Sequence, residues 1–323
     1  MVFHQTNSRI ASKIGALIVT ALIAISCATN NDPLSNAPSN NASFEKEART
    51  QRQGPALWKI TNDDVIVYLF GGQELLPDDL IWRNETIASA LTDADVFILE
   101  GDQRPEAQAA LQQLIPQLGI NRDGRTLRDF LTEDEEMEIG AVSASLGAPL
   151  PALDQLRPWL AALQLDILHI SRKGYQTRSG VAGEIIKIAE TQTDDLRFFE
   201  APGDLLKVMS ELPEETQVKM LVKAVRDIRD KPDAHDELVR FWSQGNLTEL
   251  ARILHSDEDG VWADRIVYDA LVVQRNKAWM KQITQMLDEN DGTFFVMVGI
   301  GHFVGDDSLI SLLENAGINA ILQ

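Results

Sequence analysis

The sequence has one cysteine, five histidines and far fewer basic than acidic residues. With Cys27 alone, the chain cannot form an intramolecular disulfide, and a thiol this close to the start is not a nucleophile for the rest of the chain. Lys and Arg number 29 against 49 Asp and Glu, which gives a formal charge of −20. Nucleic acids and anionic lipids need basic patches, so we expect neither as a partner.

Several catalytic signatures are also absent from the sequence. It contains no Gly-x-Ser-x-Gly, no His-Glu-x-x-His and no phosphate-binding P-loop. A dinucleotide fingerprint beginning at Gly299 and Gly301 would need its third glycine at position 304, but the glycine is at 305. The sequence therefore argues against a serine hydrolase of the elbow type, a zincin and a nucleotide-binding enzyme.

The only long hydrophobic run near the start is too short to cross a membrane. It extends from Ile14 to Ile25, follows Arg9 and Lys13, and would span about 18 Å as a helix against a bilayer core of about 30 Å. This pattern predicts a signal peptide over residues 1–27 and an exported protein of the periplasm or cell envelope. Two alternatives remain for Cys27: it resembles the lipidated cysteine of a bacterial lipoprotein, or it lies at an ordinary cleavage site. The only membrane contact we expect is through a lipid on Cys27.

Residues 28–54 and 55–323 differ in composition. The first stretch is rich in Asn, Ser, Pro and Ala without hydrophobic periodicity, which predicts a flexible tether. In the second stretch, short apolar runs predict strands near both ends, and three- and four-residue spacing predicts helices from about 204 to 290. We therefore predict an α/β fold with a central mixed sheet built from the N- and C-terminal segments and a large helical insert. Two long helices are expected at 153–170 and 261–287.

Four side chains come just after apolar runs that read as strands: Glu74, Glu100, Glu200 and His302. Carboxylates and imidazole are common metal ligands, so these residues would form a site for a divalent cation such as Mn, Co or Zn if their strands are neighbours. We assign catalytic roles to Glu74, Glu100 and His302. The alternative is that each is a solvated loop residue.

Several stretches, in order, resemble the TraB/GumN family over about residues 56–320. They are Leu57 to Ile60, Tyr68 to Gly71, Trp82, Ala94 to Glu100, Pro158 to Leu160, Arg275-Asn276 and Gly299 to His302. The resemblance implies a fold shared with erythromycin esterases and ChaN-like proteins. It also implies a relation to the Tiki proteases, and hence metal-dependent, peptidase-like hydrolysis of a peptide or small molecule.

The chain departs from the family pattern at three places. The first Gly-x-x-His of the family ends here in Glu74, its Glu-Arg is Gln274-Arg275, and its Gly-Val-Asp ends in Ala182. The second Gly-x-x-His is intact and ends in His302. A carboxylate in place of an imidazole favours a harder cation and makes a bound water less acidic. Two functions therefore stay open: a metal-dependent hydrolase, and a non-catalytic binding or scaffold protein of the cell envelope.

Overall fold

The computed structural model describes residues 54–323 except 194, 256–259, 262 and 290. The expected signal peptide, Cys27 and almost all of the expected tether lie outside the described residues. Within the part of the chain that the structure describes, none of the helices combines the length and the apolarity needed to cross a bilayer.

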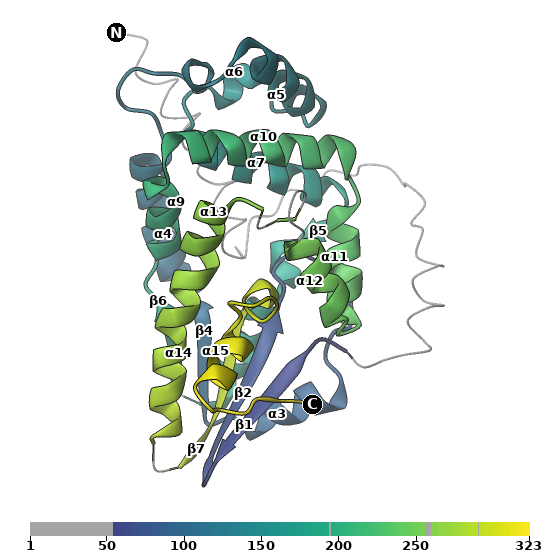
Figure 1. Cartoon of the computed structure of the whole chain (residues 1–323), viewed down its shortest axis with the longest axis vertical. Coiled ribbons are helices and arrows are strands. Elements are labelled where there is room, and N and C mark those ends of the chain that lie inside the picture. The colour runs from purple at the N-terminus through teal and green to yellow at the C-terminus, as the bar shows by residue number, and fades with distance from the viewer. Residues whose placement is uncertain (1–53, 194, 256–259, 262, 290) are drawn as a thin grey trace.

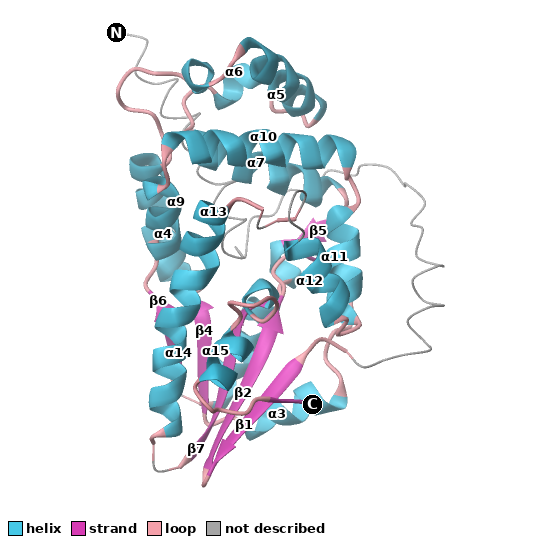
Figure 2. Ribbon diagram, viewed as in Figure 1, coloured by secondary structure: helices cyan, strands magenta, loops and turns pink. Residues whose placement is uncertain are grey.

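A mixed six-stranded sheet forms one half of the molecule (Figures 1 and 2). Its strands follow the order β6-β4-β7-β2-β1-β8. The first four run parallel, whereas β1 is antiparallel to both β2 and β8. The predicted α/β class is therefore confirmed. The strand bounds are β1 (Leu57–Asn62), β2 (Val65–Gly72), β4 (Val96–Gly101), β6 (Leu196–Glu200), β7 (Gly292–Gly299) and β8 (Ile321–Leu322).

Helices cover both faces of this sheet. On one face Phe295 lies near Phe70 and Phe97, and Phe70 stacks on Trp82, which comes just before α3. On the other face α14 packs its Trp279 on Phe199, with ring centroids 5.5 Å apart. Because strand residues alternate between faces, these two aromatic sets fix which helices lie on which side. The covering helices are α3 (Glu85–Asp93), α8 (Val181–Gln192), α14 (Gln274–Leu287) and α15 (Leu309–Asn315).

The other half of the molecule is helical and has its own hydrophobic core, with Trp159, Leu160, Leu221 and Val225 fully buried. Helices from both regions of predicted helix, 153–170 and the first part of 204–290, belong to it, together with further helices between β4 and β6. Its helices are α4 (Pro105–Leu118), α5 (Glu133–Ser145), α6 (Leu150–Leu153), α7 (Pro158–Arg172), α9 (Asp204–Glu211) and α10 (Glu214–Asp230). The chain then returns to the sheet through α11 (Ala234–Ser243) and α12 (Leu247–His255).

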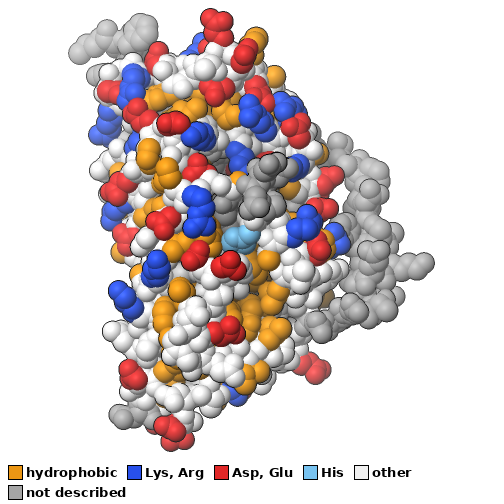
Figure 3. All heavy atoms as spheres, viewed as in Figure 1, with side chains coloured by type: hydrophobic (Ala, Val, Ile, Leu, Met, Phe, Trp, Pro, Cys, Tyr) orange, Lys and Arg blue, Asp and Glu red, His pale blue; other side chains and the backbone are white. Residues whose placement is uncertain are grey.

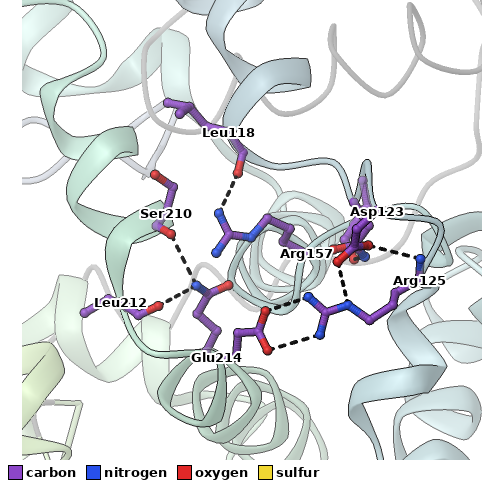
Figure 4. A network of polar contacts seen from close by, with 10 residues as sticks. Leu118, Asp123, Arg125, Arg157, Ser210, Leu212 and Glu214 are labelled. Carbon is purple, nitrogen blue, oxygen red and sulfur yellow. Dashed lines mark hydrogen bonds and ion pairs between the residues drawn. The ribbon is translucent and has the colours of Figure 1, made fainter.

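Polar contacts fasten the loop after α4 to the start of α10 (Figure 4). Arg125 donates to both oxygens of Glu214, at 2.7 and 3.1 Å, and to Asp123 at 2.6 Å. Arg157 donates to the Leu118 carbonyl at 3.1 Å. The pairs of Arg125 are exposed, so they fix the loop's position more than they stabilise the fold.

Two predicted helix bounds were wrong. The helix expected at 153–170 begins at Pro158, because a proline that lacks an N–H suits the first turn, and α6 is a separate turn before it. The helix expected at 261–287 begins only at α13 (Arg265–Tyr268), where the Asp264 side chain accepts the first free N–H groups. A π-helical turn, Asp269–Val273, then leads into α14.

The remaining elements are short. Strands β3 (Leu76–Pro77) and β5 (Tyr175–Gln176) pair as a small second sheet, and 3₁₀ turns cover Leu127–Phe130, Thr177–Ser179 and Ile300–His302. Acidic and basic side chains are interspersed over the face shown in Figure 3, while hydrophobic side chains gather over its sheet-bearing half.

Candidate functional site

The four parallel strands end side by side at one edge of the sheet. Glu200 closes β6, Glu100 lies near the end of β4, and Gly299 closes β7. The two glycine-ended strands β2 and β7 are neighbours in register, with Gly72 opposite Gly299. This edge is where open α/β sheets bind ligands. The four strands that precede the predicted residues therefore end at the same edge of the sheet.

The guanidinium of Arg275, from α14, lies between the carboxylates of Glu100 and Glu200. Its Nε and Nη2 donate to the two oxygens of Glu200 at 2.7 and 3.0 Å, and Nη2 also donates to Glu100 at 2.5 Å. The Arg275 side chain is only 10% exposed. Charge-assisted bonds of this kind, with one fork-to-fork pair, are the strong class of hydrogen bond.

His302 is buried behind this ion-pair cluster and is held as a neutral ring. Its Nδ1 lies 2.7 Å from the Asn276 side-chain oxygen, and its Nε2 lies 3.3 Å from Nη1 of Arg275. The Asn276 amide nitrogen donates to the carbonyls of His302 and Asp307, so its oxygen is the acceptor for Nδ1–H. Nε2 then presents a lone pair to Arg275. Burial is the main reason that the pKa of His302 falls to about 3, and the charge of Glu100 opposes this fall.

Glu74 follows β2 and has a different environment. Its carboxylate accepts from the Gln103 side chain at 3.2 Å and from the Ala182 N–H at 3.4 Å. Within the described residues it forms no ion pair with a lysine or arginine. Burial, reinforced by the charge of Glu100 and opposed by these two hydrogen bonds, raises the pKa of Glu74 to about 7.

Glu74 and Ala182, two of the positions where the sequence departs from the pattern that the resemblance implies, lie in contact. An acidic residue at 182 would put a second carboxylate beside Glu74, and like charges this close are costly. Alanine at position 182 therefore leaves Glu74 without a second carboxylate beside it. Gly180 lies directly against Glu74. A Cβ at position 180 would be 2.6 Å from the Glu74 carbonyl oxygen and 2.8 Å from the Oε2 of Glu74.

The two carboxylates that share Arg275 differ in their pKa. Burial would raise the pKa of Glu100, but the charge of Arg275, with smaller contributions from the hydrogen bonds that the Gly299 N–H and Arg275 donate, holds it at about 2. Burial raises the pKa of Glu200 despite its bonds to Arg275. Glu100 is therefore the carboxylate that stays ionised at any working pH. Its second oxygen accepts from the Gly299 N–H at 3.0 Å.

A cavity of about 120 Å³ opens between this sheet edge and helices α4 and α9. Four carboxylates line it, and of these Asp102 is bonded to Arg104 at 2.7 Å. Apolar side chains from the two helices form the opposite wall. Gln103 also lines the cavity, and its buried side-chain oxygen has no hydrogen-bond partner among the residues that the structure describes. The lining residues are Glu74, Leu99, Glu100, Gly101, Asp102, Gln103, Leu111, Ala182, Glu200, Ala201, Pro202, Gly203, Leu205, Leu206, Met297 and Gly299.

As arranged here, the predicted ligands do not fit a divalent cation. Both carboxylates and the imidazole direct lone pairs at the guanidinium of Arg275, which is itself a cation. In the part of the chain that the structure describes, no group of three or more His, Cys, Asp or Glu side chains is arranged to hold a metal. Binding of Mn, Co or Zn by Glu74, Glu100, Glu200 and His302 stays a prediction.

Sequence reasoning gave no site role to Arg275, Asn276 or Gln103. One signal for Arg275 was present: it lies four residues before Trp279 and eight before Ile283, and therefore on the apolar side of its helix. An arginine on that side needs buried acidic partners. Nothing in the sequence marks Gln103, because its contact with Glu74 depends on how two loops meet.

A family model described as TraB/PrgY/gumN matches residues 56–320. The chain belongs to the TraB/PrgY/gumN family. This match confirms the resemblance seen in the sequence, and it covers the same range of residues. No curated protein and no solved structure gave a match. Family membership does not by itself assign an activity to the cavity.

Proposed function

We propose that this member of the TraB/PrgY/gumN family is a hydrolase whose reaction takes place in the carboxylate-lined cavity, with Glu74 as general acid and base. One observation carries the proposal: Glu74 is the cavity carboxylate that no cation neutralises within the described residues. Asp102 is paired with Arg104, and Glu100 and Glu200 share Arg275. A carboxylate that is free to exchange a proton is what acid–base catalysis requires.

The chemistry follows from the state of Glu74. A carboxyl whose pKa is near 7 is divided between its acid and base forms at neutral pH. As base it takes a proton from water while the water oxygen bonds to a substrate carbonyl carbon. As acid it returns that proton to the leaving nitrogen or oxygen as the old bond breaks. The acidic wall favours a neutral or cationic amide or ester of a peptide or small molecule over an anionic one.

Glu100 and His302, which were predicted to be catalytic, have supporting roles in the proposed reaction. Both oxygens of Glu100 are used, one by Arg275 and one by the Gly299 N–H. His302 does not line the cavity. The proposed reaction depends on Glu74 and not on the metal that the resemblance implies, because the lone pairs that would bind a metal face Arg275.

The test compares the wild type with Glu74→Gln on a panel of unblocked and blocked peptides and simple esters. Loss of general acid–base catalysis lowers kcat by about 10²–10⁴-fold. Glu314→Gln, on the exposed side of α15, is the matched control and should keep full activity. Full activity in Glu74→Gln, or no turnover by the wild type on any substrate, would reject the proposal.

A second candidate is ligand binding without turnover, and a specific observation favours it. The described residues that line the cavity include no lysine, arginine or histidine. Acyl transfer builds negative charge on the substrate oxygen, and hydrolases normally direct positive charge or N–H groups at it. Under this alternative the wild type binds a small amine or amide and leaves it intact. Calorimetric binding with no product after prolonged incubation would support it over the first.

We also propose that the protein is exported, as the basic and apolar pattern of residues 1–27 supports. Fractionation of the cells with an antibody to the domain tests this. Detergent-dependent release that is lost in Cys27→Ser indicates a lipid anchor, whereas soluble release from both forms indicates ordinary cleavage. A full-length, uncleaved chain in the cytoplasm would contradict export.

A further inference from the structure

We propose that the guanidinium of Arg275 is the resident cation of this site, in the place that a divalent metal would take among Glu100, Glu200 and His302. The corollary is that these three residues form a latent metal site, which is uncovered when the charge at 275 is removed. This inference concerns binding alone, so it stands or falls independently of any turnover in the cavity.

The contacts of Arg275 occupy the lone pairs that would otherwise bind a metal. Its Nε and Nη2 bind both oxygens of Glu200, Nη2 binds Glu100, and Nη1 faces Nε2 of His302. Two carboxylates and one neutral imidazole are an ordinary ligand set for Mn, Co or Zn, with a combined charge of −2. In this chain a single organic cation takes one or more lone pairs from each of the three.

A second set of contacts holds Arg275 in place independently of the carboxylates. Nη1 donates to the Leu271 carbonyl at 3.0 Å, and the guanidinium lies 4.6 Å from the centre of the Trp279 ring. Leu271 belongs to the π-helical turn Asp269–Val273. A π-turn shifts the helical register by one residue, which here brings the Leu271 carbonyl to a side chain four residues on. A cation that is hydrogen-bonded to the backbone and stacked on an indole is not readily displaced by a metal ion.

Removal of Arg275 has a clear electrostatic consequence. Glu100 and Glu200 would face each other without a cation in a site where both are partly or largely buried. Such a pair either takes up a proton or binds a cation. His302 keeps its Nε2 lone pair directed at the vacated position, because Asn276 still holds its Nδ1. A divalent cation bound there would neutralise the carboxylate pair and take the Nε2 lone pair of His302, with the three side chains drawn closer together than they lie around Arg275.

The experiment measures bound metal in the full-length protein after dialysis against Mn, Co or Zn. Arg275→Met keeps an unbranched chain over Trp279 and removes the charge, whereas Arg275→Lys keeps the charge and is the matched control. We expect Arg275→Met to bind about one cation per chain, at least tenfold more tightly than the wild type or Arg275→Lys. The double variant Arg275→Met/His302→Gln should lose this gain. Cobalt absorption reports the added imidazole ligand.

Two results would overturn the inference. The first is a wild type that already binds one divalent cation and loses it in His302→Gln, because the metal and Arg275 would then occupy the site together. The second is a folded Arg275→Met that binds no more metal than Arg275→Lys. If Arg275→Met is folded but too unstable for dialysis, its thermal midpoint with and without Zn replaces the binding measurement. A rise that depends on His302 supports the latent site, and no rise contradicts it.

Discussion

Replacing Glu74 by glutamine should stabilise the protein at alkaline pH and leave its stability unchanged in acid. Burial, with the charge of Glu100 behind it, raises the pKa of this carboxyl from 4.5 to about 7 in the folded state. The folded protein therefore prefers the neutral acid, whereas the unfolded chain ionises at the ordinary value. Glutamine has nearly the same shape as the neutral acid and never takes the charge, so it removes the penalty.

The size of the effect follows from linkage. A difference of about 2.5 pH units, at 1.36 kcal/mol for each, is about 3 kcal/mol, and relaxation of the cavity makes this an upper limit. Because the pKa of Glu74 is higher in the folded state than in the unfolded chain, the folded protein loses stability as the carboxyl ionises. The acid's contribution to stability is fully present below pH 4.5 and is lost as the pH rises to about 7. Above that pH the free energy of unfolding of the wild type stays below that of Glu74→Gln by about 3 kcal/mol.

Urea unfolding of both proteins at about pH 4, 6 and 8 measures the difference. Asp166 also has a raised pKa, of about 7, but it is present in both proteins, so its contribution cancels when the two free energies of unfolding are subtracted. Glu314→Gln should show no pH-dependent difference from the wild type. A constant difference between Glu74→Gln and the wild type at all three pH values would refute the assigned ionisation of Glu74.

Three further outcomes are expected. Gly180→Ala brings a Cβ to 2.6 Å from the Glu74 carbonyl oxygen, so it should displace that residue and cost about 1–3 kcal/mol in urea unfolding, and an unchanged stability would be inconsistent with this contact. Trp242→Phe leaves the Gly71 carbonyl without the indole N–H that now lies 2.7 Å away, which should cost about 1–3 kcal/mol, and a loss below about 0.5 kcal/mol would show that water replaces the bond. His302 should stay neutral, with its Cε1–H proton resonance unmoved from about pH 8 to 5, and a titration midpoint near 6.5 would contradict the burial described here.

The strand ends of the candidate site were readable in the sequence, because local physics determines them. The apolar run before Gly71 and Gly72 must be buried, and a glycine-rich end lets the chain turn away from the sheet. The same argument applies to the run before Gly299 and places His302 just past the end of its strand. Strand identity and strand ends were thus available without coordinates, and the pairing of Gly72 with Gly299 was not.

Helix bounds in the middle of the chain were less predictable. Apolar spacing before Pro158 is helical, yet the helix starts at the proline, because proline is tolerated only in the first turn. The spacing across Asp269–Val273 also reads as ordinary helix, although the chain forms a π-turn there. Periodicity does not distinguish these cases, because apolar residues three and four positions apart occur in the α-helix, in the π-turn and in the short turn before Pro158 alike.

By itself, the sequence determined the family, the α/β class and the group of acidic residues and one histidine at strand ends, since each depends on residues close together in the chain. Tertiary structure decided that Arg275 reaches between Glu100 and Glu200, and that Glu74 has no ionic partner among the described residues. The physical reason is that the charge state of a buried group is set by neighbours from distant segments. Only folding brings Arg275 to a carboxylate 175 positions earlier in the chain.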